Sequence, residues 1–486
     1  METLDEISIR RDRLKILHDL KINPYPSQSA RTHDIAEILA KFNDFVSGQE
    51  VCLAGRIMAR RSHGGSTFLD LYDGSGKIQV YIKRDEVGEE AYKNLEYLDV
   101  GDFVEAIGGA FQTKKGEKSV LAKEALKLLT KTLRPLPEKW HGLNDIEIRY
   151  RKRYLDLLVN EPVKLTTLAR TEIIKFIRNY FNEAGFIEVE TPILQVLPGG
   201  ATARPFKTHH NVLDMDLYLR VAPELYLKRL LIAGLPRVYE IAKCFRNEGI
   251  DHAHNPEFTQ IELYEAYADY ESLMKRLETF LSSLVLKVHG SLDVRVGKQT
   301  LDFTPPYPRL DWSDTLDQAM GEKISEIDDD HLRTKLAQNG IEVLPHEGRG
   351  AMLDGAFKKL VRPKIIQPTF LIDHPIELSP LAKKHRTKPD RVERFQLVLA
   401  EGVELMNGFS ELNDPIDQRS RFEYQEKLRL AGDEEAHRID NDFLEALEYG
   451  MPPAAGVGIG VDRLVAILTN NHNLKEVILF PTLRPK

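Results

Sequence analysis

The 486-residue sequence has two cysteines, Cys52 and Cys244. Two cysteines cannot build a disulfide framework, which excludes the small disulfide-rich secreted class and favours a reducing compartment. No apolar run approaches the ~18–20 residues that a membrane-spanning helix needs, so no membrane partner is expected. The chain starts with an acidic segment that has no apolar core, so neither a signal nor a transit peptide is predicted. We therefore expect a cytoplasmic protein.

The sequence also lacks an excess of basic charge. Its 67 Lys+Arg against 75 Asp+Glu give a net charge of −8, which argues against a protein that coats nucleic acid by bulk charge. A local basic face is still compatible with this value. The phosphate-binding pattern Gly-x4-Gly-Lys-Ser/Thr is absent from the sequence, and no histidines or cysteines stand at zinc-ligand spacing. These absences point to a multidomain globular protein.

Changes in composition along the chain predict an α+β protein with several parts. Residues 1–45 read as a helical segment, and residues 46–132 as short strands separated by glycines, with a hairpin at Asp73-Gly74. About five strands in ~80 residues fit an oligonucleotide-binding (OB) β-barrel. Residues 133–148 form a proline-stiffened linker. Residues 149–486 mix helices and strands, with a helical insertion near 314–350.

Two segments contain residues suited to ligand binding. Along 257–265 the side chains of Phe258, Gln260, Glu262 and Tyr264 share one strand face, and Arg246 lies on the preceding strand. A carboxylate on such a face is rarely buried unless it is paired, which suggests a ligand site. In the barrel, Arg61 and Phe68 offer a cation and a stacking plane for single-stranded bases. The alternatives are a solvated sheet face and an ordinary barrel core.

Two further segments suggest phosphate and metal chemistry. Glu404 and Glu411 bracket Asn407, and such carboxylates hold Mg²⁺ or meet a cationic substrate, unless the segment is a plain polar hairpin. The pattern Gly456-Val457-Gly458-Ile459-Gly460 precedes Arg463 but lacks the βαβ context of a dinucleotide site. Its alternating glycines still permit close approach of a ligand, and Arg463 can meet a phosphate.

Three segments in this order resemble the signature motifs of class II aminoacyl-tRNA synthetases: Gly185–Pro192 with its preceding helix, Phe245–Glu248, and Gly456–Arg463. The barrel resembles the anticodon-binding domain of the subclass for lysine, aspartate and asparagine. Stretches such as Ala222–Lys228 narrow the resemblance to the lysyl-tRNA synthetase family. The resemblance implies an OB-fold barrel followed by a class II catalytic domain, and a homodimer that charges tRNA(Lys) with lysine, using ATP and Mg²⁺.

The resemblance also implies residue roles. For ATP it implies Arg246 at the α-phosphate, Phe258 and Glu248 at the adenine, and His254 and Arg463 towards the γ-phosphate, with Arg246 and Arg463 catalytic. For lysine it implies Gly200 and Glu224 at the α-amino group, Arg246 and Asn407 at the carboxylate, and Glu262, Tyr264 and Glu411 at the ε-amino group. Glu404 and Glu411 are the expected metal ligands. Arg61, Phe68 and Gln79 match anticodon-reading positions.

Two positions depart from the family pattern. Gln396 stands where the family has a second metal-binding Glu, and the spacing from it to Glu404 is one residue longer. The family's anticodon-contacting Glu falls on Ala125, with Glu124 one residue away, and a one-residue slip on a strand turns a side chain to the opposite face.

Other interpretations leave parts of the sequence unused. A synthetase paralogue that attaches lysine or an analogue to a protein typically lacks the barrel. An inactive scaffold would have lost Arg246, Glu262 or Arg463, and an aspartate or asparagine enzyme needs a cation or amide donor where Glu262 stands. A pure single-strand binder would use the barrel alone.

Overall fold

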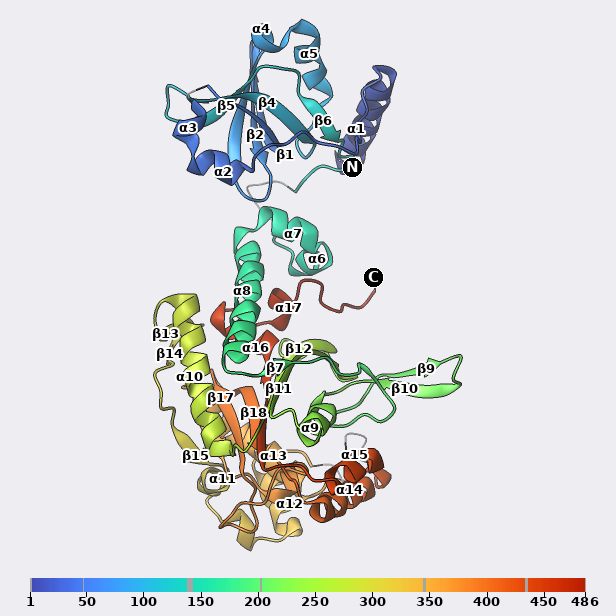
Figure 1. Cartoon of the computed structure of the whole chain (residues 1–486), viewed down its shortest axis with the longest axis vertical. Coiled ribbons are helices and arrows are strands. Elements are labelled where there is room, and N and C mark those ends of the chain that lie inside the picture. Colours follow the sequence, from blue (N-terminus) through green and yellow to red (C-terminus); the bar gives the residue numbers. More distant parts are fainter. Residues whose placement is uncertain are drawn as a thin grey trace. The chain divides into compact units, whose positions relative to one another are not determined.

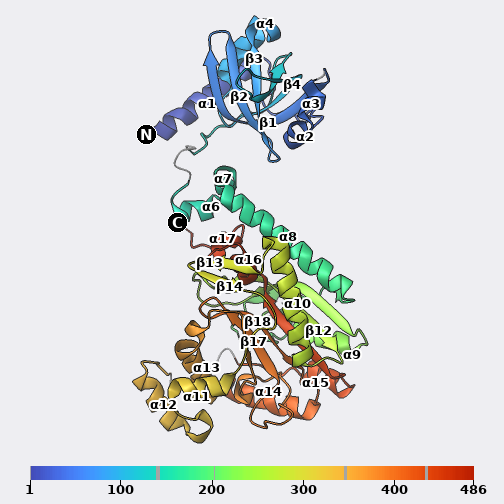
Figure 2. The same cartoon turned by 90° about the vertical axis from the view of Figure 1, so that its left-hand side faces the viewer.

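The computed structural model describes residues 2–46, 48–137, 143–201, 203–343, 347–432 and 436–485. The chain divides into two compact units, Met1–Gly142 and Leu143–Lys486, each with its own sheet and helices (Figure 1, Figure 2). Residues 138–142 of the predicted linker and residues 344–346 of the predicted insertion lie outside the described residues. Over the described ranges, none of the helices combines the length and the apolar character needed to cross a bilayer.

A closed barrel forms the centre of the first unit. Its strands are β1 (Glu50–His63), β2 (Ser66–Tyr72), β3 (Lys77–Lys83), β4 (Phe103–Gln112), β5 (Lys118–Ala122) and β6 (Lys127–Thr130). The order is β1-β2-β3-β5-β4-β6, and a further β1–β4 pairing closes five strands into a barrel. The helices are α1 (Glu2–Asp19), α2 (Ile35–Ala40), α3 (Phe42–Val46), α4 (Arg84–Val87) and α5 (Glu89–Lys93). The predicted OB barrel and the Asp73-Gly74 hairpin are confirmed.

Alternation along β2 separates the barrel core from its outer face. Thr67, Leu69 and Leu71 are buried, whereas Phe68 and Asp70 point outward and are half-buried. Successive side chains of a strand point to opposite faces, so this pattern follows directly from the sequence. The outward set is available for a partner.

An eight-stranded sheet forms the centre of the second unit, in the order β15-β16-β17-β18-β19-β12-β11-β7. The strands of the whole unit are β7 (Ile187–Glu188), β8 (Leu194–Gln195), β9 (Lys207–His210), β10 (Met215–Leu219), β11 (Arg237–Phe245), β12 (Glu257–Ala266), β13 (Asp293–Val296), β14 (Gln299–Asp302), β15 (Arg309–Asp311), β16 (Thr369–Ile372), β17 (Arg394–Leu399), β18 (Val403–Ser410) and β19 (Ala454–Gly460). Of these, β8, β10 and β9 form a separate three-stranded sheet, and β13 pairs with β14. Strands β11, β12, β19, β18 and β17 pair antiparallel.

Helices surround this sheet. They are α6 (Ile146–Arg151), α7 (Arg153–Val159), α8 (Glu161–Glu183), α9 (Glu224–Ile232), α10 (Tyr270–His289), α11 (Trp312–Met320), α12 (Asp329–Gln338), α13 (Arg349–Leu360), α14 (Pro415–Leu430), α15 (Asn441–Glu448), α16 (Val461–Leu468) and α17 (Leu474–Val477). The predicted insertion near 314–350 corresponds to α11, α12 and the start of α13. These helices share an apolar core in which Trp312 stacks on Phe357 with ring centroids 4.4 Å apart.

The two faces of the sheet have opposite character. Ile261 and Leu263 of β12 are fully buried in a core to which α8, α10 and α16 contribute. Gln260 and Glu262 alternate with them in sequence and therefore point to the other face, as the strand pattern predicts. Helices α8, α10 and α16 thus cover one face of the sheet. The other face holds the cavity and a second apolar cluster to which α9, α14 and α15 contribute.

Candidate active site

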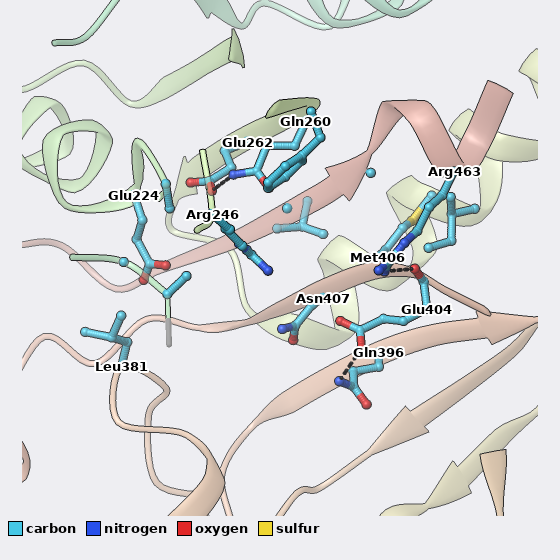
Figure 3. A pocket seen from close by; sticks show the side chains of 18 of the residues that line it. Glu224, Arg246, Gln260, Glu262, Leu381, Gln396, Glu404, Met406, Asn407 and Arg463 are labelled. Carbon is cyan, nitrogen blue, oxygen red and sulfur yellow. Dashed lines mark hydrogen bonds between the residues drawn. The ribbon is translucent and has the colours of Figure 1, made fainter. Parts of the chain in front are cut away.

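A cavity of about 540 Å³ lies on the polar face of the sheet. Strands β12, β17, β18 and β19 line it. Figure 3 shows side chains of β12, β17 and β18 pointing into it. Glu262 and Glu224 stand towards one end, and Glu404 and Arg463 stand towards the other. The cavity gathers four of the sequence segments singled out above into one site.

Glu262 is the centre of the first end. Its side chain is 5% exposed, Gln260 Nε2 donates to Oε1 at 2.6 Å, and the Tyr264 hydroxyl donates to Oε2 at 3.0 Å. Burial and then the nearby Glu224 carboxylate raise the pKa of Glu262 well above its ordinary value. A ligand ammonium at this point would favour the ionised form. The predicted common face of Phe258, Gln260, Glu262 and Tyr264 is confirmed, since all four line the cavity.

A buried lysine joins two carboxylates beside this end. Lys228 of α9 is fully buried, and its Nζ lies 2.6 Å from Glu224 Oε1 and 2.5 Å from Glu411 Oε2. Glu224 lines the cavity, whereas Glu411 is 0% exposed and is not among the residues that line it. Burial raises the pKa of Glu224, and the Lys228 ammonium opposes this effect.

The glycines of β19 make room for these groups. A Cβ at Gly456 would collide with the Tyr264 ring and with Glu411 Oε1. A Cβ at Gly458 would meet nothing closer than Glu262 Cγ at 3.8 Å, an ordinary contact. Gly456 therefore has no side chain because Tyr264 and the Glu411 carboxylate occupy the space that one would need. Gly200 similarly faces Glu224, whose Cβ would lie 2.8 Å from an added Cβ.

Cations occupy the middle of the cavity. The Arg246 guanidinium lies 5.0 Å from the centre of the Phe258 ring, and its Nε is buried without a hydrogen-bond partner among the described residues. Arg394 Nε donates to Asn407 Oδ1 at 3.0 Å. Figure 3 shows Arg246 and Asn407 pointing into the space between the two ends. An anion here would find two guanidinium groups within reach.

Glu404 stands at the second end with cations around it. Its Oε2 accepts from Gln396 Nε2 at 3.1 Å and lies 3.6 Å from an Arg362 nitrogen, and its carbonyl accepts from Arg463 at 2.9 Å. His374 lies 3.1 Å from Gln396 Oε1. Burial, and then the Arg394 charge, lower the pKa of His374 well below its ordinary value, so its ring is neutral at pH 7.

Glu404 and Glu411 do not meet. They stand at opposite ends of β18, and seven residues of extended strand span ~23 Å. One ion cannot bind both carboxylates, and the Lys228 ammonium already occupies the cation position at Glu411. The sequence names Glu404 and Glu411 as metal ligands, but the structure does not bring their carboxylates together, because about seven residues of extended strand separate them. Among the described residues, no cluster of three or more His, Cys, Asp or Glu suits a metal.

The predicted loop residues lie at the rim. Glu248 is exposed, and His254 is held by Asp251, whose Oδ1 accepts from the His254 backbone amide at 2.7 Å. Both residues line the cavity. Their exposure is compatible with contact to the outer part of a bound ligand.

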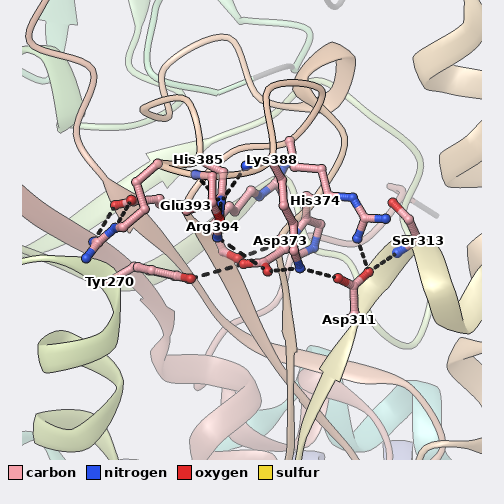
Figure 4. A network of polar contacts seen from close by, with 12 residues as sticks. Tyr270, Asp311, Ser313, Asp373, His374, His385, Lys388, Glu393 and Arg394 are labelled. Atoms are coloured by element: carbon pink, nitrogen blue, oxygen red, sulfur yellow. Dashed lines mark hydrogen bonds and ion pairs between the residues drawn. The ribbon is translucent and has the colours of Figure 1, made fainter. Parts of the chain in front are cut away.

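A polar network fixes the segment between β16 and β17 (Figure 4). Lys388 Nζ donates to Asp373 at 2.7 Å and to Asp311 at 2.9 Å, and the Tyr270 hydroxyl donates to Asp373 at 3.1 Å. Arg394 reaches the same segment through Ser379 Oγ at 2.9 Å. Residues 378–381 of this segment line the cavity, so the network fastens one wall.

The barrel of the first unit has a second candidate binding surface on its outer face. Arg61 pairs with Phe68 across β1 and β2, and Phe68 pairs with Tyr81 across β2 and β3. The Phe68 and Tyr81 rings stack at 4.4 Å with planes 4° apart. Gln79 is on the same outer face and accepts from Ser119 at 3.0 Å. The structure thus brings the three predicted positions together.

Glu124 and Ala125 lie in the loop between β5 and β6, and both are exposed. The expectation that they sit on a barrel strand is therefore wrong, and a strand slip does not decide which of them faces a partner. The predicted site residues did not include Lys228, Arg394 or Tyr81. Tyr81 could have been found, because it is two residues from Gln79 on a strand.

Comparisons with known proteins place the chain in a family. A family model described as "tRNA synthetases class II (D, K and N)" matches residues 145–484, and one described as "OB-fold nucleic acid binding domain" matches residues 51–128. A protein of Pelotomaculum thermopropionicum named lysine–tRNA ligase is 48% identical, covering 100% of this chain and 96% of the relative. Relatives of that name from Syntrophomonas wolfei and Moorella thermoacetica are each 49% identical, covering 98% and 99% of this chain and 97% and 98% of the relatives.

We predict that Gly456→Ala destabilises the second unit by about 1–3 kcal/mol, the usual effect of inserting a methyl group into a filled space. Gly458→Ala on the same strand is the matched control, because its added methyl group meets only ordinary contacts. Thermal unfolding of the two variants measures the difference. Equal unfolding temperatures for both variants would contradict the role assigned to Gly456.

Proposed function

The chain belongs to the class II tRNA synthetases of the D, K and N group, and we propose that it activates L-lysine with ATP and transfers the lysyl group to tRNA(Lys). The buried Glu262 carboxylate at one end of a cavity that also holds Arg246 carries this proposal. The relatives, similar over their full length, favour this activity over a protein-modifying paralogue or an aspartate or asparagine enzyme.

Charge pairing supports the assignment of the lysine site. The substrate ε-ammonium would be received by Glu262 and Tyr264, with Glu411 close behind Gly456. The α-ammonium would be received by Glu224 and by the backbone at Gly200. The substrate carboxylate would meet Arg246 and Asn407, the latter oriented by Arg394. An uncharged analogue would leave Glu262 buried and unpaired, which discriminates strongly. Arginine would fail because its planar fork needs a different spacing.

The cations of the second end support the assignment of the ATP site. Adenine would stack on Phe258, on the ring that already contacts the Arg246 guanidinium, with Glu248 beside it. Arg246 would hold the α-phosphate. His254 at the rim and Arg463 at the start of α16 would face the γ-phosphate. Aromatic stacking and guanidinium–phosphate pairs are the interactions that a nucleotide needs.

Mg²⁺ fits the site through Glu404. Magnesium in nucleotide sites is usually bound through one or two carboxylates together with substrate phosphates. Glu404 is 23% exposed in its side chain and faces the cavity, whereas the neutral Gln396 holds its Oε2 in place. When bound, the ion would supply positive charge against the phosphates.

The reaction needs positioning rather than a general base. The lysine carboxylate has a pKa near ~3.5 and is already ionised at neutral pH. Its oxygen attacks the α-phosphorus, an O–P bond forms, and pyrophosphate leaves with the broken bond's electrons. Arg246 holds both reactants in one orientation and stabilises the charge that develops. A ribose hydroxyl of tRNA then attacks the lysyl carbonyl, and AMP leaves.

We propose that the chain forms a homodimer. Leu165 and Leu168 on α8 are 56% and 52% exposed, and Ile187 on β7 is 46% exposed. These side chains belong to the segments that resemble motif 1. Exposed large apolar side chains on segments that carry this family resemblance are suited to contact with a second copy of the chain. The cytoplasmic location expected from the sequence also stays a prediction.

We predict that Arg246→Ala lowers lysine-dependent ATP–pyrophosphate exchange at least about 100-fold, since removing one charge-stabilising donor typically has this effect. Lysine should drive exchange in the unmodified protein far better than the other amino acids. Lys323→Ala, an exposed cation paired with Glu326, is the control and should leave exchange unchanged. Exchange driven by a different amino acid would overturn the proposed function.

We predict that lysine binding releases protons, because burial and the Glu224 carboxylate raise the pKa of Glu262 and an ammonium that pairs with Glu262 lowers it again. Affinity for lysine should therefore increase as the pH rises through the raised pKa of Glu262, as long as the ligand ammonium groups stay protonated. The groups around Glu262 are Glu224, Lys228, Glu240, Cys244 and Tyr264. Calorimetry in buffers of different ionisation enthalpy counts the protons. Glu262→Gln should reduce the release, and a buffer-independent heat would refute the prediction.

We predict that Arg61→Ala combined with Phe68→Ala spares pyrophosphate exchange but raises the KM for tRNA at least about fivefold, since stacking of one base contributes ~1–3 kcal/mol. Exchange needs only the second unit, whereas charging needs the barrel face. Lys15→Ala, an exposed cation on α1, is the matched control in the same unit. Unchanged charging by the double variant would show that this face does not read tRNA.

A further inference from the structure

Lys228 lies beside the proposed lysine site without lining the cavity. It is fully buried, and its ammonium contacts Glu224 and Glu411 at 2.6 and 2.5 Å. The rings of Phe409 and Phe443 are 5.2 and 6.0 Å away and cover the remaining side. The charge of Lys228 is therefore paired within the chain.

The charges around the site can be counted. In the ionised form that bound ammonium groups favour, Glu224, Glu262 and Glu411 would supply three negative charges and Lys228 one positive charge, which leaves two. His437 adds none at neutral pH, because burial and the Lys228 charge lower its pKa to about 4. A lysine substrate brings two ammonium groups to this end of the cavity. Its carboxylate would instead meet the guanidinium groups of Arg246 and Arg394.

Glu411 belongs to this charge count although it does not line the cavity. Both of its oxygens are buried, and Oε1 has no hydrogen-bond partner among the described residues. A carboxylate in this position is costly unless a cation lies near it, because burial removes its hydration. Lys228 is that cation on one side. On the other side, the space next to Gly456 and Tyr264 adjoins the cavity.

We propose that Lys228 is a positioning and specificity-determining residue that cancels one of three carboxylate charges, so that the site matches a ligand with two ammonium groups. This inference rests on the proposed function and deepens it. The alternative is that Lys228 only packs α9 against β18. The charge-balance role and the packing role predict different KM values for lysine when Lys228 and Glu411 are neutralised together.

The experiment measures the KM for lysine and for ATP in pyrophosphate exchange, using the full chain. Lys228→Met leaves three carboxylates with no internal cation and should raise the lysine KM at least about tenfold, since breaking a buried pair from one side is strongly unfavourable. Glu411→Gln leaves one net negative charge and should also raise the lysine KM. The KM for ATP should change by less than about threefold in both variants.

The double variant Lys228→Met with Glu411→Gln distinguishes the charge-balance role of Lys228 from a packing role. It restores two net negative charges, so its lysine KM should be lower than that of either single variant. A packing role predicts the reverse, because two cavity-altering changes add. Lys228→Arg keeps the charge and should retain a lysine KM closer to the unmodified value than Lys228→Met does. If Lys228→Met does not fold, comparison of Glu411→Gln with the double variant gives the same answer.

Failure of this inference is distinct from failure of the proposed function. If the unmodified chain shows no lysine-dependent exchange, the proposed function is wrong. If the unmodified chain does show lysine-dependent exchange, and the lysine KM of the double variant is no lower than that of Glu411→Gln, Lys228 does not set the charge of the site. Recovery in the double variant, with the ATP KM unchanged, supports the charge balance.

Discussion

The catalytic unit depends on burying three carboxylates next to one small cavity. A buried carboxylate costs several kcal/mol unless cations or hydrogen-bond donors surround it. The protein meets this cost in two ways. Gln260 and Tyr264 donate to Glu262, and the Lys228 ammonium contacts Glu224 and Glu411. Burial and the Glu224 carboxylate still raise the pKa of Glu262 in the free site, and a bound ammonium would favour its ionised form. Under the proposed function, the ligand would therefore supply positive charge that the folded chain does not supply itself.

The antiparallel sheet makes this arrangement possible. Each strand presents one row of side chains to the helices and one to the cavity, so apolar packing and polar chemistry use alternate residues of the same segment. On β12 this separates Ile261 from Glu262. On the neighbouring β19, Gly456 contributes no side chain, which gives Tyr264 and the Glu411 carboxylate the space they occupy. Gly456 thus answers a steric need, whereas Gly458 on the same strand has room for a side chain.

The part of the site that follows from strand periodicity could be predicted from the sequence. The common face of Phe258 and Glu262 follows from the two-residue repeat of side chains along a strand. The barrel hairpin follows from the residues of its turn. Lys228 could not be found this way. Glu224 and Lys228 are four residues apart on a helix, a spacing that usually indicates a solvated surface pair. Its burial depends on Phe409 and Phe443, which are distant in sequence. The separation of Glu404 from Glu411 likewise became clear only once β18 was seen to be extended.

Away from Glu262 the cavity carries positive charge. Arg246 and Arg394 supply it in the middle of the cavity and Arg463 supplies it at the far end, near Glu404. Lysine has its carboxylate and α-ammonium on one carbon and its ε-ammonium at the other end of the molecule, so the ε-ammonium would turn towards Glu262 and the carboxylate towards these cations. Phosphates are drawn to the same cationic end, which brings the substrate carboxylate and the nucleotide together. Opposed charges in one cavity thus select the ligand and also set the direction in which it reacts.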